Sequence, residues 1–404
     1  MSTTSPAVGY RAVLQLRGLR SVFIAHAVSM AGTVAAEVAL SILIFERTGS
    51  PLLSALVLVC AFLPYAFGGI ALSSISDRFP ARRVLVCCDL ASGACVAAML
   101  IPGIPVGGLL GLLLLTGIVA PIFAGARAAS LAQLLGADLF PVGRSLLRAI
   151  GQLTLLTGFA LGAVAVAAIG PTWLLALDAV TFLASAALIG FGTPYTAAVG
   201  RIGSTLQDSL SGLRYLWCNV PLRRLILLSW VVPAFSSMPD GLAVAYAAQT
   251  GAATAAAGAL FTGYAVGGVL GEFAAARLTP ATRRRLVIPL IVLSQIPAIA
   301  FITEPSIPVA AVLLAISGSG YAFNHGIDPL ILNAIGPEYR GRVFTVQTSG
   351  LMAIQGLSIA LAGAIGTLIR PNLTICLAGI VGTVVTLLLA RRALIKGAVT
   401  RRPG

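Results

Sequence analysis

Two stretches of the chain match one another: GGIALSSISDR at residues 68–78 and GGVLGEFAAAR at residues 267–277. In each, two adjacent glycines lead a run of small and apolar residues to an arginine, and a proline-alanine pair and a cluster of arginines come next. Such self-similarity indicates a repeated structural unit. The repeat therefore predicts two related halves, which differ in that Asp77 of the first corresponds to Ala276 of the second.

The composition predicts that both halves lie in a membrane. Of the 404 residues, 58% are apolar and 9% are charged, and the mean hydropathy is +1.01. About a quarter of the residues of a soluble protein are charged, so an ordinary soluble protein is excluded. A helix that crosses a bilayer needs about 20 apolar residues, and the apolar content is enough for roughly a dozen such helices.

Apolar runs bounded by arginine clusters, prolines or glycines predict twelve transmembrane helices in two groups of six. We expect an all-α integral membrane protein with an N-terminal six-helix bundle at 1–195, a cytoplasmic linker with an amphipathic helix at 196–224, and a C-terminal six-helix bundle at 225–404. The predicted spans are residues 21–45, 52–74, 84–102, 106–126, 146–168, 173–193, 225–247, 254–275, 286–303, 308–328, 343–368 and 373–390.

The basic residues predict the orientation of the spans. If the N-terminus is cytoplasmic, all of the 26 basic residues except Arg47 and Arg370 fall on the cytoplasmic side, as the positive-inside rule requires. This distribution explains the net charge of +14 without a nucleic-acid partner. Because Lys396 is the single lysine, the sequence has no phosphate-binding loop of the type G-x-x-x-x-G-K-[ST], and we expect no use of ATP.

The sequence also lacks the patterns of a metal centre or an enzyme. Its two histidines are far apart and its six cysteines mostly lie in apolar runs, so we expect no metal and no cofactor. No G-x-S-x-G nucleophile turn is present. The scarcity of lysine beside abundant alanine, glycine and arginine indicates GC-rich bacterial coding. We therefore expect the bacterial plasma (inner) membrane as the location. We expect a multi-pass monomer there, with both termini in the cytoplasm.

The loop after the second predicted span resembles the signature loop of the major facilitator superfamily, G-x-L-a-D-R-x-G-R-[RK]-x-x-L. Residues 73–85 read SSISDRFPARRVL and match this pattern at Asp77, Arg78, Arg82 and Leu85. Ser73 and Pro80 stand where the pattern has glycine, and Ala81 stands where it has arginine. Three further strings are similar to the branch of that family that contains the enterobactin exporter and related drug and siderophore efflux proteins. They are WLLALDAVTFLAS at 173–185, GLRYLW at 212–217 and PEYRGRV at 337–343.

This resemblance covers essentially the whole chain and implies its function. It implies two six-helix halves that face each other across a central cavity, and proton-coupled export of an amphipathic small molecule by alternating access. A drug, an antibiotic or a siderophore-like compound would be the substrate. Two alternatives stay open: a proton- or solute-coupled importer, and a membrane sensor or scaffold that transports nothing.

The resemblance also implies a latch on the cytoplasmic side. Asp77 would hold the two halves closed through arginines and through the positive end of a helix in the other half. Arg78, Arg82 and Arg127 are the candidate members of this latch in the sequence.

Small residues and prolines mark places where the helices pack closely or bend. Residues 151–163 resemble the antiporter motif of the family and contain Gly158 and Gly162, four residues apart. These glycines predict close helix packing, either alone or together with a role in export. Pro233 and Pro239 interrupt the seventh span, and either a gating hinge or a static kink would produce such a break.

Two acidic residues are the candidates for proton coupling. Glu37 lies 17 residues beyond Arg20 in the first span, and Asp240 lies 16 residues beyond Arg224 in the seventh, so the repeat places them at matching depth. A charge at the centre of a bilayer costs at least about 2.5 to 3.5 kcal/mol, which calls for a functional reason. The alternatives are that Glu37 bonds a neighbouring helix and that Asp240 only caps a broken one.

Other ionisable residues near membrane depth have structural roles as their first interpretation. We expect Glu272 to pair with Arg277, and Asp178 to make a hydrogen bond between packed helices. His325 and Asp328 are three residues apart and share one helical face. They are either satisfied structural groups or a proton relay, and they remain secondary site candidates.

Overall fold

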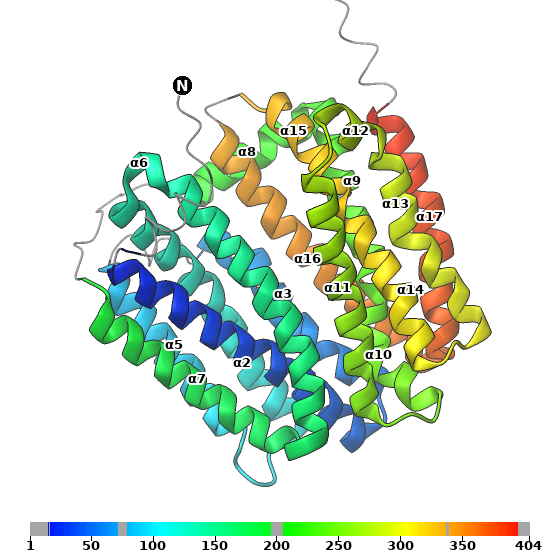
Figure 1. Cartoon of the computed structure of the whole chain (residues 1–404), viewed down its shortest axis with the longest axis horizontal. Coiled ribbons are helices and arrows are strands. Elements are labelled where there is room, and N and C mark those ends of the chain that lie inside the picture. Colours follow the sequence, from blue (N-terminus) through cyan, green and yellow to red (C-terminus); the bar gives the residue numbers. More distant parts are fainter. Residues whose placement is uncertain (1–14, 16, 72–78, 195–204, 337–338, 395–404) are drawn as a thin grey trace, which may run out of the picture. The chain divides into compact units, whose positions relative to one another are not determined.

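The computed structural model describes residues 15, 17–71, 79–194, 205–336 and 339–394. All regular elements in these ranges are helices (Figure 1). The α-helices are α2 (Arg17–Thr48), α3 (Pro51–Ala71), α5 (Ala81–Ala98), α6 (Val106–Ile169), α7 (Pro171–Gly192), α8 (Thr205–Cys218), α9 (Val220–Ser236), α10 (Met238–Gln249), α11 (Ala257–Ala276), α12 (Pro280–Arg285), α13 (Val287–Gln295), α14 (Ile307–Ser319), α15 (Asn324–Ala334), α16 (Arg340–Leu368) and α17 (Pro371–Leu394), and the 3-10 helices are η1 (Thr254–Ala256), η2 (Ile296–Thr303) and η3 (Gly320–Phe323).

The all-α membrane class predicted from the sequence is confirmed. Eight helical segments of the described chain are long and apolar enough to cross a membrane. Shorter apolar helices at Pro51–Tyr65, Leu153–Ile169 and Val287–Thr303 overlap three more of the predicted spans. The eight segments are Gly18–Thr48, Val106–Ala128, Pro171–Gly192, Val220–Gln249, Ala257–Ala276, Ile307–Ala334, Arg342–Leu368 and Pro371–Leu394.

The longest element, α6, contains two of the predicted spans without a break in its helical backbone. Its 64 residues would extend about 96 Å in a straight helix, about three times the hydrocarbon thickness of a bilayer. A Cβ atom added to Gly143 would collide with Leu135, although eight residues of straight helix separate two atoms by about 12 Å. Leu135 also shares a hydrophobic cluster with Leu146 and Leu147. The element therefore folds back on itself between its two apolar arms.

The contacts within the chain group into two units. The first contains Met1–Leu40 and Phe67–Thr205, and the second contains Ser41–Ala66 and Leu206–Gly404. The division at residues 195 and 224 predicted from the sequence stays a prediction.

In the first unit, α5 packs against α6 and α7. Two glycines of α6 bring this helix close to α2: a Cβ on Gly158 would lie 2.7 Å from Val34, and a Cβ on Gly162 would lie 2.9 Å from the Cα of Ala35. At both glycines α6 thus lies in close contact with α2, and their role in packing and export stays a prediction. Gly170 has a φ of 80°, which a glycine adopts without strain, and this turn joins α6 to α7.

In the second unit, α11 and α14 pack through glycines. Gly263, Gly267 and Gly271 are four residues apart and form one face of α11. A Cβ on each would collide with the backbone of α14, and Figure 1 shows the two helices side by side. Small residues at this spacing allow helix backbones to approach closely in a membrane. A helix also forms in the predicted linker: α8 contacts α16, where the hydroxyl of Ser211 accepts a hydrogen bond from Arg342 at 3.2 Å.

Substitution of two adjacent glycines of α11 tests this packing. Gly267→Ala should lower stability by about 1 to 3 kcal/mol, the usual cost of overpacking, because the new methyl group meets the backbone of Ala315. Gly268→Ala is the matched control, since its Cβ would lie 3.8 Å from the nearest atom, the carbonyl oxygen of Gly318. Unfolding of the purified variants in detergent measures both. Equal stability of the two variants would contradict the close packing of α11 and α14.

Candidate functional site

Glu37 lies within the first unit, on α2. Its side chain is half-buried, and within the described residues it has no hydrogen-bond partner. The structure places it close enough to Asp178 of α7 for the two carboxyl groups to interact electrostatically. The alternative, a hydrogen bond from Glu37 to a neighbouring helix, is not made to any of the described residues.

Asp178 is held in place where α7 meets α2. It is 2% exposed, and one carboxyl oxygen lies 3.2 Å from the hydroxyl of Thr181. A Cβ on Gly32 of α2 would lie 2.6 Å from that same oxygen, so this glycine makes room for the carboxyl group. Two turns further along the same side of α7, Ser185 donates a hydrogen bond of 2.6 Å to Asp89 of α5.

Asp240 lies within the second unit, at the break between α9 and α10. Pro233 is inside α9, and Pro239 occupies the first turn of α10 together with Asp240. An acidic residue in the first turn interacts favourably with the helix dipole, which agrees with the capping alternative. Even so, the carboxyl group of Asp240 has no hydrogen-bond partner among the described residues, and its side chain is half-buried.

Neighbouring side chains stabilise the backbone around this break. Gln295 is 1% exposed and donates a hydrogen bond to the carbonyl oxygen of Val232 at 3.1 Å. The indole of Trp230 donates to the carbonyl oxygen of Gln347 at 2.8 Å. The contact of Gln295 supplies a donor to the backbone of the proline-broken helix, and the contact of Trp230 joins α9 to α16. The break in the seventh span is thus observed, and its role in gating stays a prediction.

Glu272 and His325 form a hydrogen-bonded pair that the sequence did not predict. The Nε2 atom of His325 lies 2.7 Å from Oε2 of Glu272, with side chains 28% and 34% exposed. The sequence predicts Arg277 as the partner of Glu272, whereas the structure pairs Glu272 with His325. His325 therefore bonds to another helix, α11, while Asp328 lies one turn further along α15 and is exposed.

Only part of the expected latch falls within the described chain. Asp77 and Arg78 lie outside the described residues, so the latch stays a prediction. Arg82 donates a hydrogen bond to the carbonyl oxygen of Gly190. Arg127 bonds to Nδ1 of His26. In the first unit these two arginines thus join α5 to α7 and α6 to α2.

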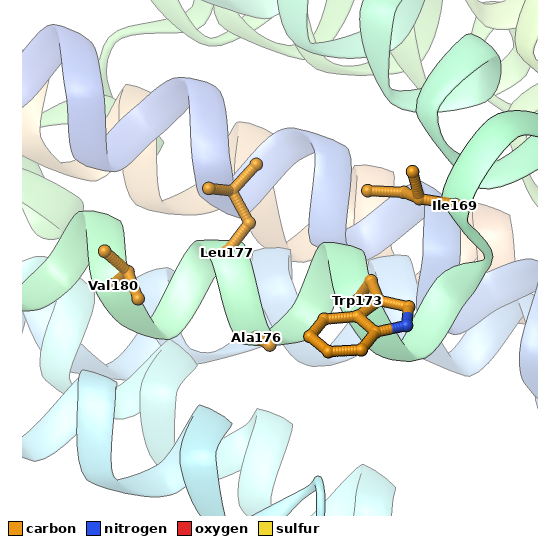
Figure 2. Close-up of a pocket in the computed structure, with 5 residues that line it drawn as sticks. All are labelled: Ile169, Trp173, Ala176, Leu177 and Val180. Atoms are coloured by element: carbon orange, nitrogen blue, oxygen red, sulfur yellow. The ribbon is translucent and has the colours of Figure 1, made fainter.

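An open apolar depression lies along α7 (Figure 2). Trp173, Leu177 and Val180 line it and are 70%, 52% and 57% exposed. Asp178 is on the same helix but is buried on another side. An exposed apolar face is what a membrane helix presents to lipid, so this depression is not a candidate substrate site. Among the described residues, no group of three or more histidine, cysteine and acidic side chains is arranged to hold a metal ion.

The sequence analysis missed two tyrosines of the second unit. The hydroxyl of Tyr264 on α11 donates to Ser236 at 3.3 Å, and it interacts electrostatically with Asp240. Tyr321 of η3 interacts in the same way with Glu272 and Asp328. The signal available in the sequence was the spacing of Tyr264 and Glu272, which are eight residues apart and so lie on one face of a helix.

Comparisons with known proteins agree with this fold. The multidrug efflux pump Tap of Mycobacterium tuberculosis (strain ATCC 25618 / H37Rv) is 28% identical over 362 residues, which is 85% of either chain. The Tap pump of Mycolicibacterium fortuitum is 26% identical over 353 residues, which is 82% of this chain and 85% of that one.

Solved structures of transporters share the fold at low sequence identity. A POT family transporter superposes with a TM-score of 0.77 at 10% identity, over 97% of this chain and 100% of that one. The nucleoside transporter NupG gives 0.72 at 12% identity, over 93% and 98%. Residues 22–245 match the Major Facilitator Superfamily. This match covers more than half of the chain, and the chain therefore belongs to the Major Facilitator Superfamily, as a non-enzymatic transporter of a bacterial membrane.

Proposed function

We propose that this transporter exports an amphipathic small molecule in exchange for protons, by alternating access, with Glu37 and Asp240 as the coupling carboxylates. The proposal rests on the burial of these two acids and on their lack of hydrogen-bond partners among the described residues. They occupy equivalent spans of the repeat, are half-buried, and have no hydrogen-bond partner among the described residues. The similarity to multidrug efflux pumps supports export of a drug-like compound, and a siderophore-like compound is the other substrate that the sequence resemblance implies.

The chemistry of coupling follows from the surroundings of these acids. An unpaired carboxyl group away from water is more stable neutral than charged. It can be neutralised by a proton, or it can pair with a cationic or polar substrate, but one group does not do both at once. Near Glu37, Asp178 adds a second carboxyl group, and charging both at close range is unfavourable. Competition between proton and substrate is the basis of exchange.

The proton gradient supplies enough energy for this exchange. One proton that crosses about 150 mV releases roughly 3.5 kcal/mol. That free energy supports a substrate gradient of a few hundredfold. No further energy source is needed for efflux.

Neutral substitutions of the two acids test the proposal in proteoliposomes loaded with ethidium, a cationic fluorescent dye. In Glu37→Gln and Asp240→Asn, the pH-driven dye gradient should fall from as much as a few hundredfold to about onefold. Exchange of dye down its own gradient should be retained, because it needs no proton. The control is Glu304→Gln, which removes an exposed ion pair with Arg370 and should transport normally.

Three results would each contradict a part of the proposal. Driven transport that survives in both variants would show that neither acid couples. Dye movement in the same direction as the protons would indicate an importer. Absence of any dye movement and of any proton response in the wild-type protein would favour a sensor or scaffold.

The orientation of the chain is part of the same proposal, with both termini in the cytoplasm. Cysteines introduced at positions 47 and 304, in a background without native cysteines, should react with a membrane-impermeant thiol reagent in intact cells. Cys218 retained alone in that background should not react, because α8 would lie on the cytoplasmic side. Labelling of Cys218 and not of the introduced cysteines would invert the orientation.

A further inference from the structure

The last helix, α17, has an exposed apolar stripe that leads to an arginine. Residues three or four apart lie on one side of a helix, and four apolar residues at this spacing are 46% to 53% exposed: Leu377, Val381, Val384 and Leu388. Arg391 follows Leu388 by three residues, so it continues the same side, and it is exposed. A lipid chain that lies on this stripe would bring its headgroup to Arg391.

The beginning of α9 lies beside this end of α17. Nη1 of Arg224 donates a hydrogen bond to the carbonyl oxygen of Arg392 at 3.4 Å. Leu222 of α9 and Ala393 of α17 belong to one buried hydrophobic cluster, which fixes the start of one helix against the end of the other. The packing therefore brings together two pairs of consecutive arginines, at positions 223–224 and 391–392.

Trp217, near the end of α8, contacts the remaining arginine of α9. Nη1 of Arg223 donates to the carbonyl oxygen of Trp217 at 3.1 Å, and its guanidinium carbon lies 5.6 Å from the centre of the indole ring. Trp217 is 48% exposed. Because tryptophan is enriched where a membrane meets water, its position indicates that the two arginine pairs lie at the level of the lipid headgroups.

The positive charge of the two arginine pairs is not neutralised within the described residues. None of the four forms an ion pair with an acidic side chain there. Arg223 and Arg224 each use one N–H group in the bonds above, whereas a guanidinium group has five. Arginines also stabilise the end of a helix and collect on the cytoplasmic side. Neither role requires that the arginines of two helices meet at the end of a lipid-facing stripe.

We propose that the two arginine pairs, together with Trp217, bind the headgroup of an anionic phospholipid whose acyl chains lie along α17. Guanidinium groups donate hydrogen bonds to phosphate oxygens in a favourable geometry, and the acyl chains cover the apolar stripe. Basic pockets between membrane helices bind headgroups of this kind. The site is independent of the proposed exchange of substrate for protons.

Native mass spectrometry of the delipidated protein tests the site, with phosphatidylglycerol as the anionic probe and phosphatidylcholine as the zwitterionic one. The wild type should bind phosphatidylglycerol in preference to phosphatidylcholine. In the double variant Arg224→Gln/Arg391→Gln, the dissociation constant for phosphatidylglycerol should rise about thirtyfold, or about fivefold for each arginine. Arg224→Lys/Arg391→Lys keeps both charges and should recover most of the affinity.

Two controls separate this site from a general effect of charge or of misfolding. Arg284→Gln/Arg285→Gln removes two exposed arginines of α12, the same change in net charge, and should bind as the wild type does. Arg391→Gln alone changes an exposed side chain that makes no hydrogen bond among the described residues. It should therefore fold normally, as its thermal unfolding will report, and still weaken binding about fivefold.

Three results would each overturn the proposal. If the Arg224→Gln/Arg391→Gln variant binds phosphatidylglycerol as tightly as the wild type, these arginines only stabilise helix ends. If it and the α12 control lose affinity equally, binding follows net charge and no site exists. If inorganic phosphate displaces the lipid, the arginine pairs take a free anion and the apolar stripe contributes nothing.

Discussion

The cost of a charge in the apolar interior of a bilayer governs both the fold and the chemistry of this protein. In the predicted topology it confines nearly all arginines to one side of the membrane, and it agrees with a chain in which 9% of the residues are charged. The same cost applies to the few acids that remain at membrane depth. Asp178 and Asp89 are bonded to hydroxyl groups, whereas Glu37 and Asp240 have no hydrogen-bond partner among the described residues. Those two are therefore the groups to which we assign the proposed proton coupling.

Much of the architecture could be predicted from the sequence, because the features concerned are local. Hydropathy predicted the helices, and Pro239 marked the start of α10 in the seventh span. The spacing of Gly158 and Gly162 predicted the close approach to another helix, although only the structure identifies α2 as that helix. The return of α6 on itself agrees with the two predicted spans 106–126 and 146–168. That the connection stays helical was not predicted, because it contains Gly136, Pro141 and Gly143, which usually interrupt a helix.

The pairing of side chains from different helices could not be predicted in the same way. Arg277 is near Glu272 in sequence, but the structure pairs Glu272 with His325, 53 residues away. Asp178 and Glu37 are likewise brought together by the packing of α7 on α2. Sequence spacing defines which residues share a face of one helix. It does not determine which face of the next helix lies opposite, and in the second unit the glycine contacts between α11 and α14 determine that choice.

The most direct test of the central claim is the direction of proton movement when the wild-type protein moves a dye. Proteoliposomes with a trapped pH indicator and no initial pH difference receive ethidium on the outside. The account predicts that dye entering through the protein drives protons out, so the lumen becomes alkaline, and that protein-free liposomes show no such change. Dye entry without a change of pH, or with acidification of the lumen, would contradict exchange of a substrate for protons.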